Sequence, residues 1–452
     1  MSLQALFFNP QKNRQLWALA LPMILSNITI PLLGLVDTAV VGHLSDAYYL
    51  GGVAVGSTII TLIIWLLGFL RMATTGLVAQ AYGANNTEEQ CRLLVQSVML
   101  ALMLGCGIIL LQSPILNLAT ALMDASREVE HYCREYFSIR IWSTPFALVN
   151  LVMLGWLLGQ QQPKAAMWQL IFANSANIAL DILFVLGLGC GVQGAALASV
   201  FADITAFAVA FTMVWRQLNT DVNFSIDQLR RHVSYRGYGQ LLRLNRDIFI
   251  RSLCLQAAFS FMTFHAASLG DSTVAANAVL LNLLLLVSYA LDGIAYYAEA
   301  EVGRAYGKKH QQMLNESVAL AFAWSAIIAC GFCLVFALGG QLLVEQLTNI
   351  HSVRNAANEY LFWLTLLPLL SFASYLFDGV YIGAAKGNIM RNSMIFSTLA
   401  VFFPIWYLLQ DYQNHGLWAA MSAFMIGRSV SLAIHYWISH QAWLVPDVKK
   451  LV

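Results

Sequence analysis

The amino-acid sequence predicts an all-α polytopic membrane protein of twelve transmembrane helices in two pseudo-symmetric six-helix bundles. Two observations carry this prediction. First, 59% of the 452 residues are hydrophobic and only 10% are charged, whereas a soluble domain carries about 25% charged residues. Second, residues 53–83 align without a gap with residues 277–307, at a constant offset of 224 residues. A repeat of half the chain inside an apolar protein is the construction of many secondary transporters.

The expected helices are apolar runs of about 20 residues, each long enough to cross about 30 Å of hydrocarbon. They occur at residues 14–42, 50–75, 94–118, 138–160, 166–188, 192–215, 244–268, 275–302, 317–339, 357–383, 391–410 and 416–438. The longest polar stretch, residues 216–243, separates the sixth run from the seventh. We therefore expect a first bundle over residues 1–215, a cytoplasmic linker over 216–243 and a second bundle over 244–452.

The distribution of basic residues predicts the orientation of the chain. An even number of spans places both termini on one side of the membrane. The loops expected on that side hold most of the lysines and arginines, whereas the opposite loops hold chiefly Arg127, Arg134 and Arg354. Because cytoplasmic loops are enriched in Lys and Arg, we expect both termini in the cytoplasm.

Charge and cysteine content exclude other functional classes. A net charge of +1 offers no bulk electrostatic attraction to nucleic acid. The CxxC pair Cys330 and Cys333 lies in an apolar run, which favours core packing over a metal or redox site. We expect no catalytic residue, metal or organic cofactor. The expected partners are the lipid bilayer and small molecules, and the chain is expected to be a monomer.

The first span carries an acidic residue, Asp37, although a central Asp costs about 2.5–3.5 kcal/mol on membrane insertion. Two prolines, Pro22 and Pro31, precede Asp37 in the same span. Because a proline removes a helix hydrogen bond and kinks the helix, the first helix is predicted to bend.

The fifth span carries Asp181, four residues after Asn177 and seven after Asn174, so that all three share one helix face. Asp37, Asp181 and Ser199 of the sixth span each lie about 9 Å from the outer end of their span at 1.5 Å per residue. Carboxylates held within a membrane commonly bind and release protons. We interpret this group as an ion-coupling site; the alternative is a static polar network that holds helices together.

The spans of the second bundle also carry acidic residues. Asp292 and Glu299 lie seven residues apart in the eighth span, and Asp378 lies in the tenth. Each is a secondary candidate for a coupling or substrate site. Each could equally be an ion-pair partner of Arg251 or Arg428, and the structural interpretation is slightly favoured.

Several stretches resemble the multidrug and toxic compound extrusion (MATE) family, most closely its DinF branch. They are LPMILSNITIPLLGLVDTAVVGHL, RMATTGLVAQAYG and NIALDILFVLGLGCGVQGAALAS, and the resemblance covers nearly all of the chain. It implies two six-helix lobes related by a pseudo-two-fold axis in a V. It also implies export of organic, often cationic or amphipathic compounds, driven by inward flow of H⁺ or Na⁺.

The resemblance carries functional residues over to this chain. The acid of helix 1 corresponds to Asp37, the acid and amide of helix 5 to Asp181 and Asn177, the hydroxyl of helix 6 to Ser199 and the bending proline to Pro22.

The chain also departs from some members of the family. An asparagine on helix 4 is replaced by Leu154, and an acid midway along helix 7 is absent, where Arg251 is found. The offset of 224 places Leu154 on Asp378 and Asp37 on Met262 or a neighbour. The fold is thus predicted to be duplicated, but the coupling acids are expected in the first copy alone.

The sequence therefore predicts a multidrug efflux antiporter that exchanges xenobiotics for H⁺ through Asp37 and Asp181, with bending of helix 1 near Pro22. Substrate is expected to contact Asn174, Asn177 and Asp181. Coupling to Na⁺ is left open, because the same oxygen atoms could bind that ion.

The sequence disfavours two other functions. A flippase for lipid-linked oligosaccharide is disfavoured, because the spans of the first bundle contain few basic residues, chiefly Arg71. One hypothesis is that Arg71 forms an ion pair with Asp203 of the sixth span. A membrane-embedded enzyme such as a lipid-modifying transferase is disfavoured by the lack of clustered catalytic groups.

Overall fold

The computed structural model describes residues 6–41, 47–121, 126–222 and 237–444, and within these ranges the regular secondary structure is helical. Eleven helical stretches of the described residues are long and apolar enough to cross a membrane. With α2 (Pro10–Val41), a helix of 32 residues, they make up the twelve spans expected from the sequence. The prediction of an all-α polytopic membrane protein is confirmed.

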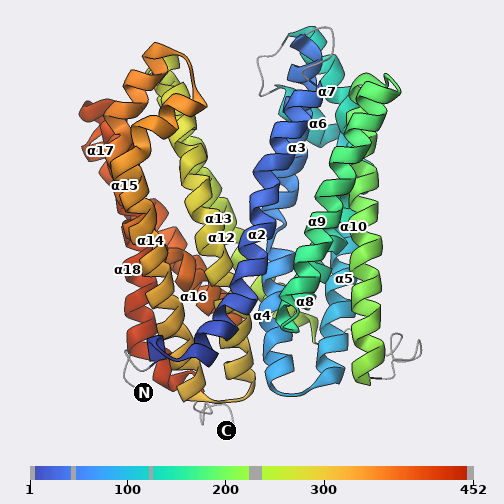
Figure 1. Cartoon of the computed structure of the whole chain (residues 1–452), viewed down its shortest axis with the longest axis vertical. Helices are drawn as coiled ribbons and strands as arrows, with labels where there is room; N and C mark the ends of the chain where they lie inside the picture. The colour runs from blue at the N-terminus through green and yellow to red at the C-terminus, as the bar shows by residue number, and fades with distance from the viewer. Residues whose placement is uncertain (1–5, 42–46, 122–125, 223–236, 445–452) are drawn as a thin grey trace. The chain divides into compact units, whose positions relative to one another are not determined.

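The chain divides into two compact units, residues 25–241 and residues 1–24 together with 242–452. We call them the N-terminal unit and the C-terminal unit. The N-terminal unit contains the second half of α2 and the blue to green helices of Figure 1. These are α3 (Ala47–Leu66), α4 (Phe69–Gly83), α5 (Thr87–Leu110), α6 (Gln112–Ala121), α7 (Arg127–Arg140), α8 (Thr144–Gly159), α9 (Pro163–Asp181) and α10 (Gly191–Val222).

The C-terminal unit contains the helices drawn in yellow to red in Figure 1. They are α12 (Tyr238–Ser268), α13 (Asp271–Gly307), α14 (Gln311–Leu347), α15 (His351–Gly383), α16 (Gly387–Phe396), α17 (Phe403–Leu408) and α18 (Gln413–Ser439). A π-helical segment precedes α17, at Ser397–Phe402, and another follows α9, at Ile182–Gly187. Several candidate membrane spans consist of two helices in succession: α3 with α4, α7 with α8, and α16 with α17.

The turns that follow the duplicated helices confirm the repeat in atomic detail. After α4, the N–H groups of Ala84, Asn85 and Asn86 bond to carbonyls four, three and five residues back; after α13, those of residues 308–310 do the same. The second residue of each turn has positive φ, 54° at Asn85 and 55° at Lys309. Because the two turns are equivalent residue by residue, the offset of 224 found in the sequence is an offset of structure.

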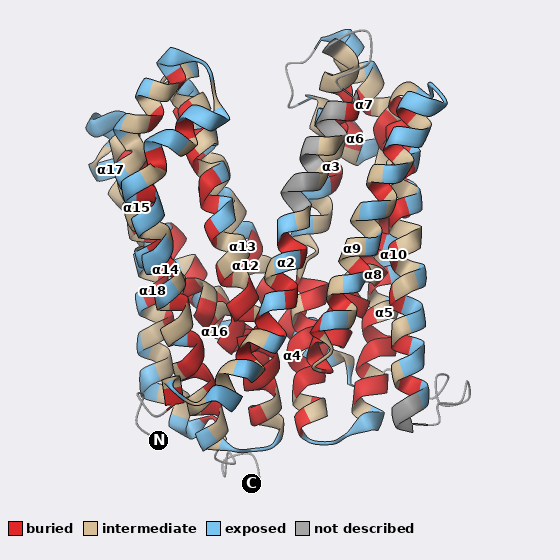
Figure 2. Cartoon of the chain, viewed as in Figure 1, coloured by how far each residue is buried: buried red, intermediate tan, exposed pale blue. Residues whose placement is uncertain are grey.

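Glycines of the repeat allow pairs of helices to pack backbone against backbone. A Cβ atom at Gly379 of α15 would lie 2.5 Å from the carbonyl oxygen of Ala295 in α13. Its counterpart Gly155 in α8 meets the carbonyl oxygen of Arg71 in α4 in the same way. This close approach is typical of small residues in membrane helix pairs. Figure 2 shows buried residues gathered around α4 and α8 in one unit and around α16 in the other.

This packing gives a first testable prediction. Replacing Gly379 with alanine is expected to lower the free energy of unfolding by about 1–3 kcal/mol, because the new methyl group overpacks against a carbonyl oxygen. Gly331→Ala in α14 is the matched control, since a Cβ there meets no atom within 4 Å. Thermal unfolding of both variants in detergent measures the difference, and equal stability of the two would contradict the packing argument.

The first half of α2 packs within the C-terminal unit. Gln15 donates a hydrogen bond of 2.8 Å to Glu301, and Trp324 donates one of 2.8 Å to Asn13. These contacts explain why the boundary between the compact units falls at residues 24/25, inside a continuous helix. The sequence-based domain limits, 1–215 and 244–452, stay a prediction.

The expected linker, residues 216–243, is partly helical. The helix α10 continues to Val222, and α12 begins at Tyr238. The residues between them, 223–236, lie outside those that the structure describes.

Candidate functional site

A cavity of about 190 Å³ lies in the N-terminal unit, between residues of α2, α3, α7, α9 and α10. Three predicted site residues line this cavity: Asn174 and Asn177 of α9 and Ser199 of α10. The structure thus brings Ser199 close to the two amides that the sequence placed on one face of the fifth span.

Hydrogen bonds connect these residues across helices. Asn177 Nδ2 donates to Ser199 Oγ at 3.2 Å. Asn174 Nδ2 donates to the hydroxyl of Thr29 in α2 at 2.5 Å. The helix face that carries both asparagines is therefore linked to α10 on one side and to α2 on the other.

Of the two predicted coupling acids, the structure describes the side chain of Asp181 but not that of Asp37. Asp181 is the last residue of α9, one turn after Asn177, and is only 3% exposed. It directly precedes the π-helical segment Ile182–Gly187. The backbone of Asp37 lies in α2, but its side chain is outside those that the structure describes. Its role as a coupling acid stays a prediction.

The predicted hinge residue, Pro22, is buried in α2. It lies within one turn of the boundary between the two compact units, at residues 24/25. The carbonyl four residues before a proline has no helix N–H partner, so that one backbone hydrogen bond of the helix is missing in this part of α2.

An ion pair in the cavity wall was missed by the sequence analysis. Arg140 Nη1 lies 2.6 Å from Asp203 Oδ2, and both residues line the cavity. Ser143 Oγ donates to the same oxygen at 2.9 Å. The hypothesis that Asp203 forms an ion pair with Arg71 is wrong, because the ionic partner of Asp203 is Arg140.

A depth argument would have found this pair. Arg140 ends α7, 13 residues after the helix begins at Arg127, and Asp203 lies 12 residues after the start of α10 at Gly191. At 1.5 Å per residue, the two are about 20 Å and 18 Å along their helices from the same end of the unit.

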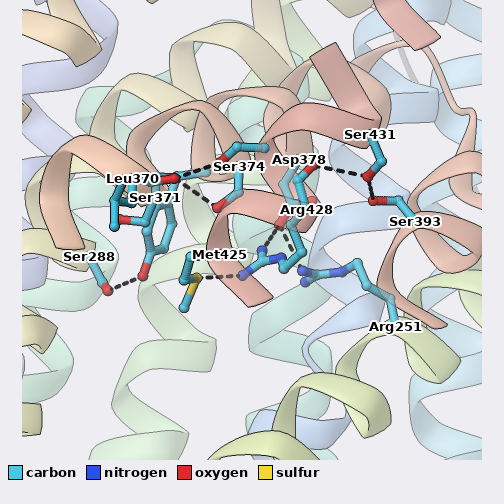
Figure 3. A network of polar contacts seen from close by, with 12 residues as sticks. Arg251, Ser288, Leu370, Ser371, Ser374, Asp378, Ser393, Met425, Arg428 and Ser431 are labelled. Atoms are coloured by element: carbon cyan, nitrogen blue, oxygen red, sulfur yellow. Dashed lines mark hydrogen bonds and ion pairs between the residues drawn. The ribbon is translucent and has the colours of Figure 1, made fainter. Parts of the chain in front are cut away.

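In the C-terminal unit, Asp378 of α15 is held by two arginines (Figure 3). Its Oδ2 atom accepts a hydrogen bond of 2.8 Å from Arg251 of α12 and one of 2.9 Å from Arg428 of α18. The arginines are 5% and 2% exposed. The charge of Asp378 is thus already balanced by two buried guanidinium groups, so that the geometry favours the structural interpretation of this acid.

The other two secondary candidates lie on α13. Glu299 is 2% exposed, and its carbonyl oxygen packs against Gly383 of α15. Asp292, seven residues earlier, is half-buried. The roles of both acids stay predictions. Among the described residues, no group of three or more His, Cys, Asp and Glu side chains is arranged to hold a metal ion.

Comparisons with known proteins agree with these features. The MatE family model matches residues 22–183 and 248–408, one segment for each copy of the repeat. The chain is 44% identical to the DNA damage-inducible protein F of Escherichia coli (strain K12), over 94% of this chain and 92% of that protein. It is 24% identical to a probable multidrug resistance protein NorM of Bacillus anthracis, over 94% and 93% of the two chains.

A solved structure, "Crystal structure of MATE in the straight conformation", superposes with a TM-score of 0.85 at 22% sequence identity. The superposition covers 98% of each chain. At this identity the likeness shows a common fold, and it agrees with the two helical bundles described above.

Proposed function

The chain belongs to the MatE family, and we propose that it is a secondary active exporter of organic compounds driven by inward flow of protons. The relatives named as multidrug resistance proteins support export of xenobiotics. The observation that carries the proposal is the polar cavity of the N-terminal unit, in which Asn174, Asn177 and Ser199 meet. Beside the buried acid Asp181, such a group fits a substrate or ion pathway, because ionisable residues inside a membrane commonly mark one.

The proposed coupling uses the acids of the same unit. Protons neutralise Asp37 and Asp181, and the hydrogen bond from Asn177 to Ser199 rearranges. Helix α2 then bends near Pro22, the cavity shrinks and the compound is released outward. The buried position of Asp181 supports this sequence of events, because a desolvated carboxylate gains most from neutralisation.

We also propose that the protein acts as a monomer in the bacterial inner membrane, with both termini in the cytoplasm and no bound cofactor. Coupling to Na⁺ is the second candidate. Carboxylate, amide and hydroxyl oxygens are the ligands that hard cations prefer, and Asp181, Asn177 and Ser199 supply all three kinds.

Transport by purified protein in liposomes tests the proposal and the ion together. We expect an organic cation such as ethidium to move against its gradient when a pH difference is imposed in Na⁺-free buffer. Protein-free liposomes and a proton ionophore are the controls. Movement that needs a Na⁺ difference would replace the proton by Na⁺, and movement under neither gradient would contradict ion-driven export.

A further inference from the structure

The ion pair of Arg140 and Asp203 has no part in the coupling scheme, although both residues line the cavity. Their side chains are 12% and 21% exposed. Within the described residues, the two side-chain hydrogen bonds to the carboxylate of Asp203 both end on its Oδ2 atom. In the same part of the structure, no side chain donates a hydrogen bond to its Oδ1 atom.

Stabilisation of the fold does not by itself explain the ion pair of Arg140 and Asp203. Removing two charges from water costs several kcal/mol per ion, and replacing a buried pair by apolar residues is often neutral or stabilising. A pair that borders a cavity can instead offer its two charges to a ligand. Nearby, Asn174 uses its Nδ2 atom on Thr29, which leaves its carbonyl oxygen as a further acceptor on the cavity wall.

The pair also determines which charges the cavity attracts. A plain cation beside Asp203 lies almost as close to Arg140, because the two charged atoms are only 2.6 Å apart. The repulsion from Arg140 then offsets part of the attraction to Asp203. A compound with one cationic and one anionic group gains at both ends, with its cation on Asp203 and its anion on Arg140.

We propose that Arg140 and Asp203 are specificity-determining residues, through which the cavity selects amphoteric organic compounds over plain cations of the same size. The cavity, at about 190 Å³, is smaller than the 300–1,000 Å³ that is usual for drug-sized ligands. It therefore receives the charged end of such a compound. This inference rests on the proposed export function and names its substrate class.

Binding of a matched pair of ligands to the purified protein tests this inference. Norfloxacin carries an amine and a carboxylate, and its ethyl ester keeps the amine but lacks the anionic group. Isothermal titration calorimetry, which needs no ion gradient, gives the dissociation constants. We expect the wild type to bind norfloxacin about tenfold more tightly than the ester, the factor typical of one hydrogen bond to a charged group.

Substitutions of Arg140 and Asp203 distinguish a role in ligand selectivity from a purely structural role of the pair. Arg140→Gln is expected to remove the preference for norfloxacin while binding of the ester stays equal or becomes tighter, because Asp203 loses its competing cation. The double variant Arg140→Gln with Asp203→Asn removes both charges, leaves no unpaired buried charge and should bind the two ligands equally. A purely structural pair would weaken both ligands in parallel, which would overturn the inference.

Two further results distinguish this inference from the export function. A wild type without preference between the two ligands would overturn the inference while ion-driven export still holds. A wild type that prefers norfloxacin but moves it under no gradient would support the selectivity and overturn the proposed export.

Discussion

Replacing Asp378 with asparagine is expected to lower the free energy of unfolding by about 3–5 kcal/mol, the usual result of removing one partner of a buried ion pair. The carboxylate accepts hydrogen bonds of 2.8 Å from Arg251 and 2.9 Å from Arg428. Without this charge, Arg251 and Arg428 would both lose the carboxylate that they share, and repulsion between buried like charges is strong in a medium of low dielectric constant. Thermal unfolding in detergent measures the loss.

Two further variants give this experiment its controls. Glu359→Gln neutralises an acid whose side chain is 59% exposed and should change stability by less than about 0.5 kcal/mol. A triple variant, Asp378→Leu with Arg251→Leu and Arg428→Met, should recover most of the loss, because a whole buried ionic group can be replaced by apolar residues. Wild-type stability of Asp378→Asn together with failed export would instead make Asp378 a coupling residue.

The number and type of helices could be predicted because hydropathy reports the length of an apolar run directly. The repeat could be predicted for a related reason. The residues that align at an offset of 224, such as Gly155 with Gly379, make equivalent backbone contacts. A position that must be small in one copy must be small in the other.

Hydropathy could not predict how the helices are subdivided. The break between α3 and α4, at residues 67–68, lies inside one apolar run, where a kink and a straight helix have the same composition. Hydropathy could not predict the unit boundary at residues 24/25 either, because this boundary lies inside the continuous helix α2. The boundary depends on the side-chain contacts of Gln15 and Asn13 with the C-terminal unit. In the sequence, these two residues look like the polar residues at the start of any helix.

The polar site could be predicted in part. Asn177 and Ser199 share a hydrogen bond, because helical spacing and depth bring their faces to a similar level, whereas their role in ion coupling stays a prediction. The partner of Asp203 could have been predicted from depth, which favours Arg140 over Arg71. Depth limits the choice of partner, and the rotation of each helix about its axis then decides which side chains of one level meet.

Asp181→Asn is expected to uncouple export from the proton gradient while substrate still binds. Asparagine has nearly the shape of aspartate and suits the buried end of α9, but it cannot bind and release a proton. One proton moving down a difference of one pH unit supplies about 1.4 kcal/mol, or a factor of ten in an equilibrium ratio. If Asp181 carries one coupled proton per cycle, the steady-state accumulation ratio falls about tenfold per unit of imposed pH difference.

Asp292→Asn is the matched comparison, because it neutralises an acid of the C-terminal unit that the sequence left as a secondary candidate. We expect its accumulation ratio to equal that of the wild type in the same liposomes. The reverse pattern, with Asp181→Asn fully coupled and Asp292→Asn deficient, would move the coupling site to the second copy of the repeat. Because the proton gradient acts only through groups that bind protons differently in the two conformations, the variant that loses the tenfold factor identifies the unit that carries the proton.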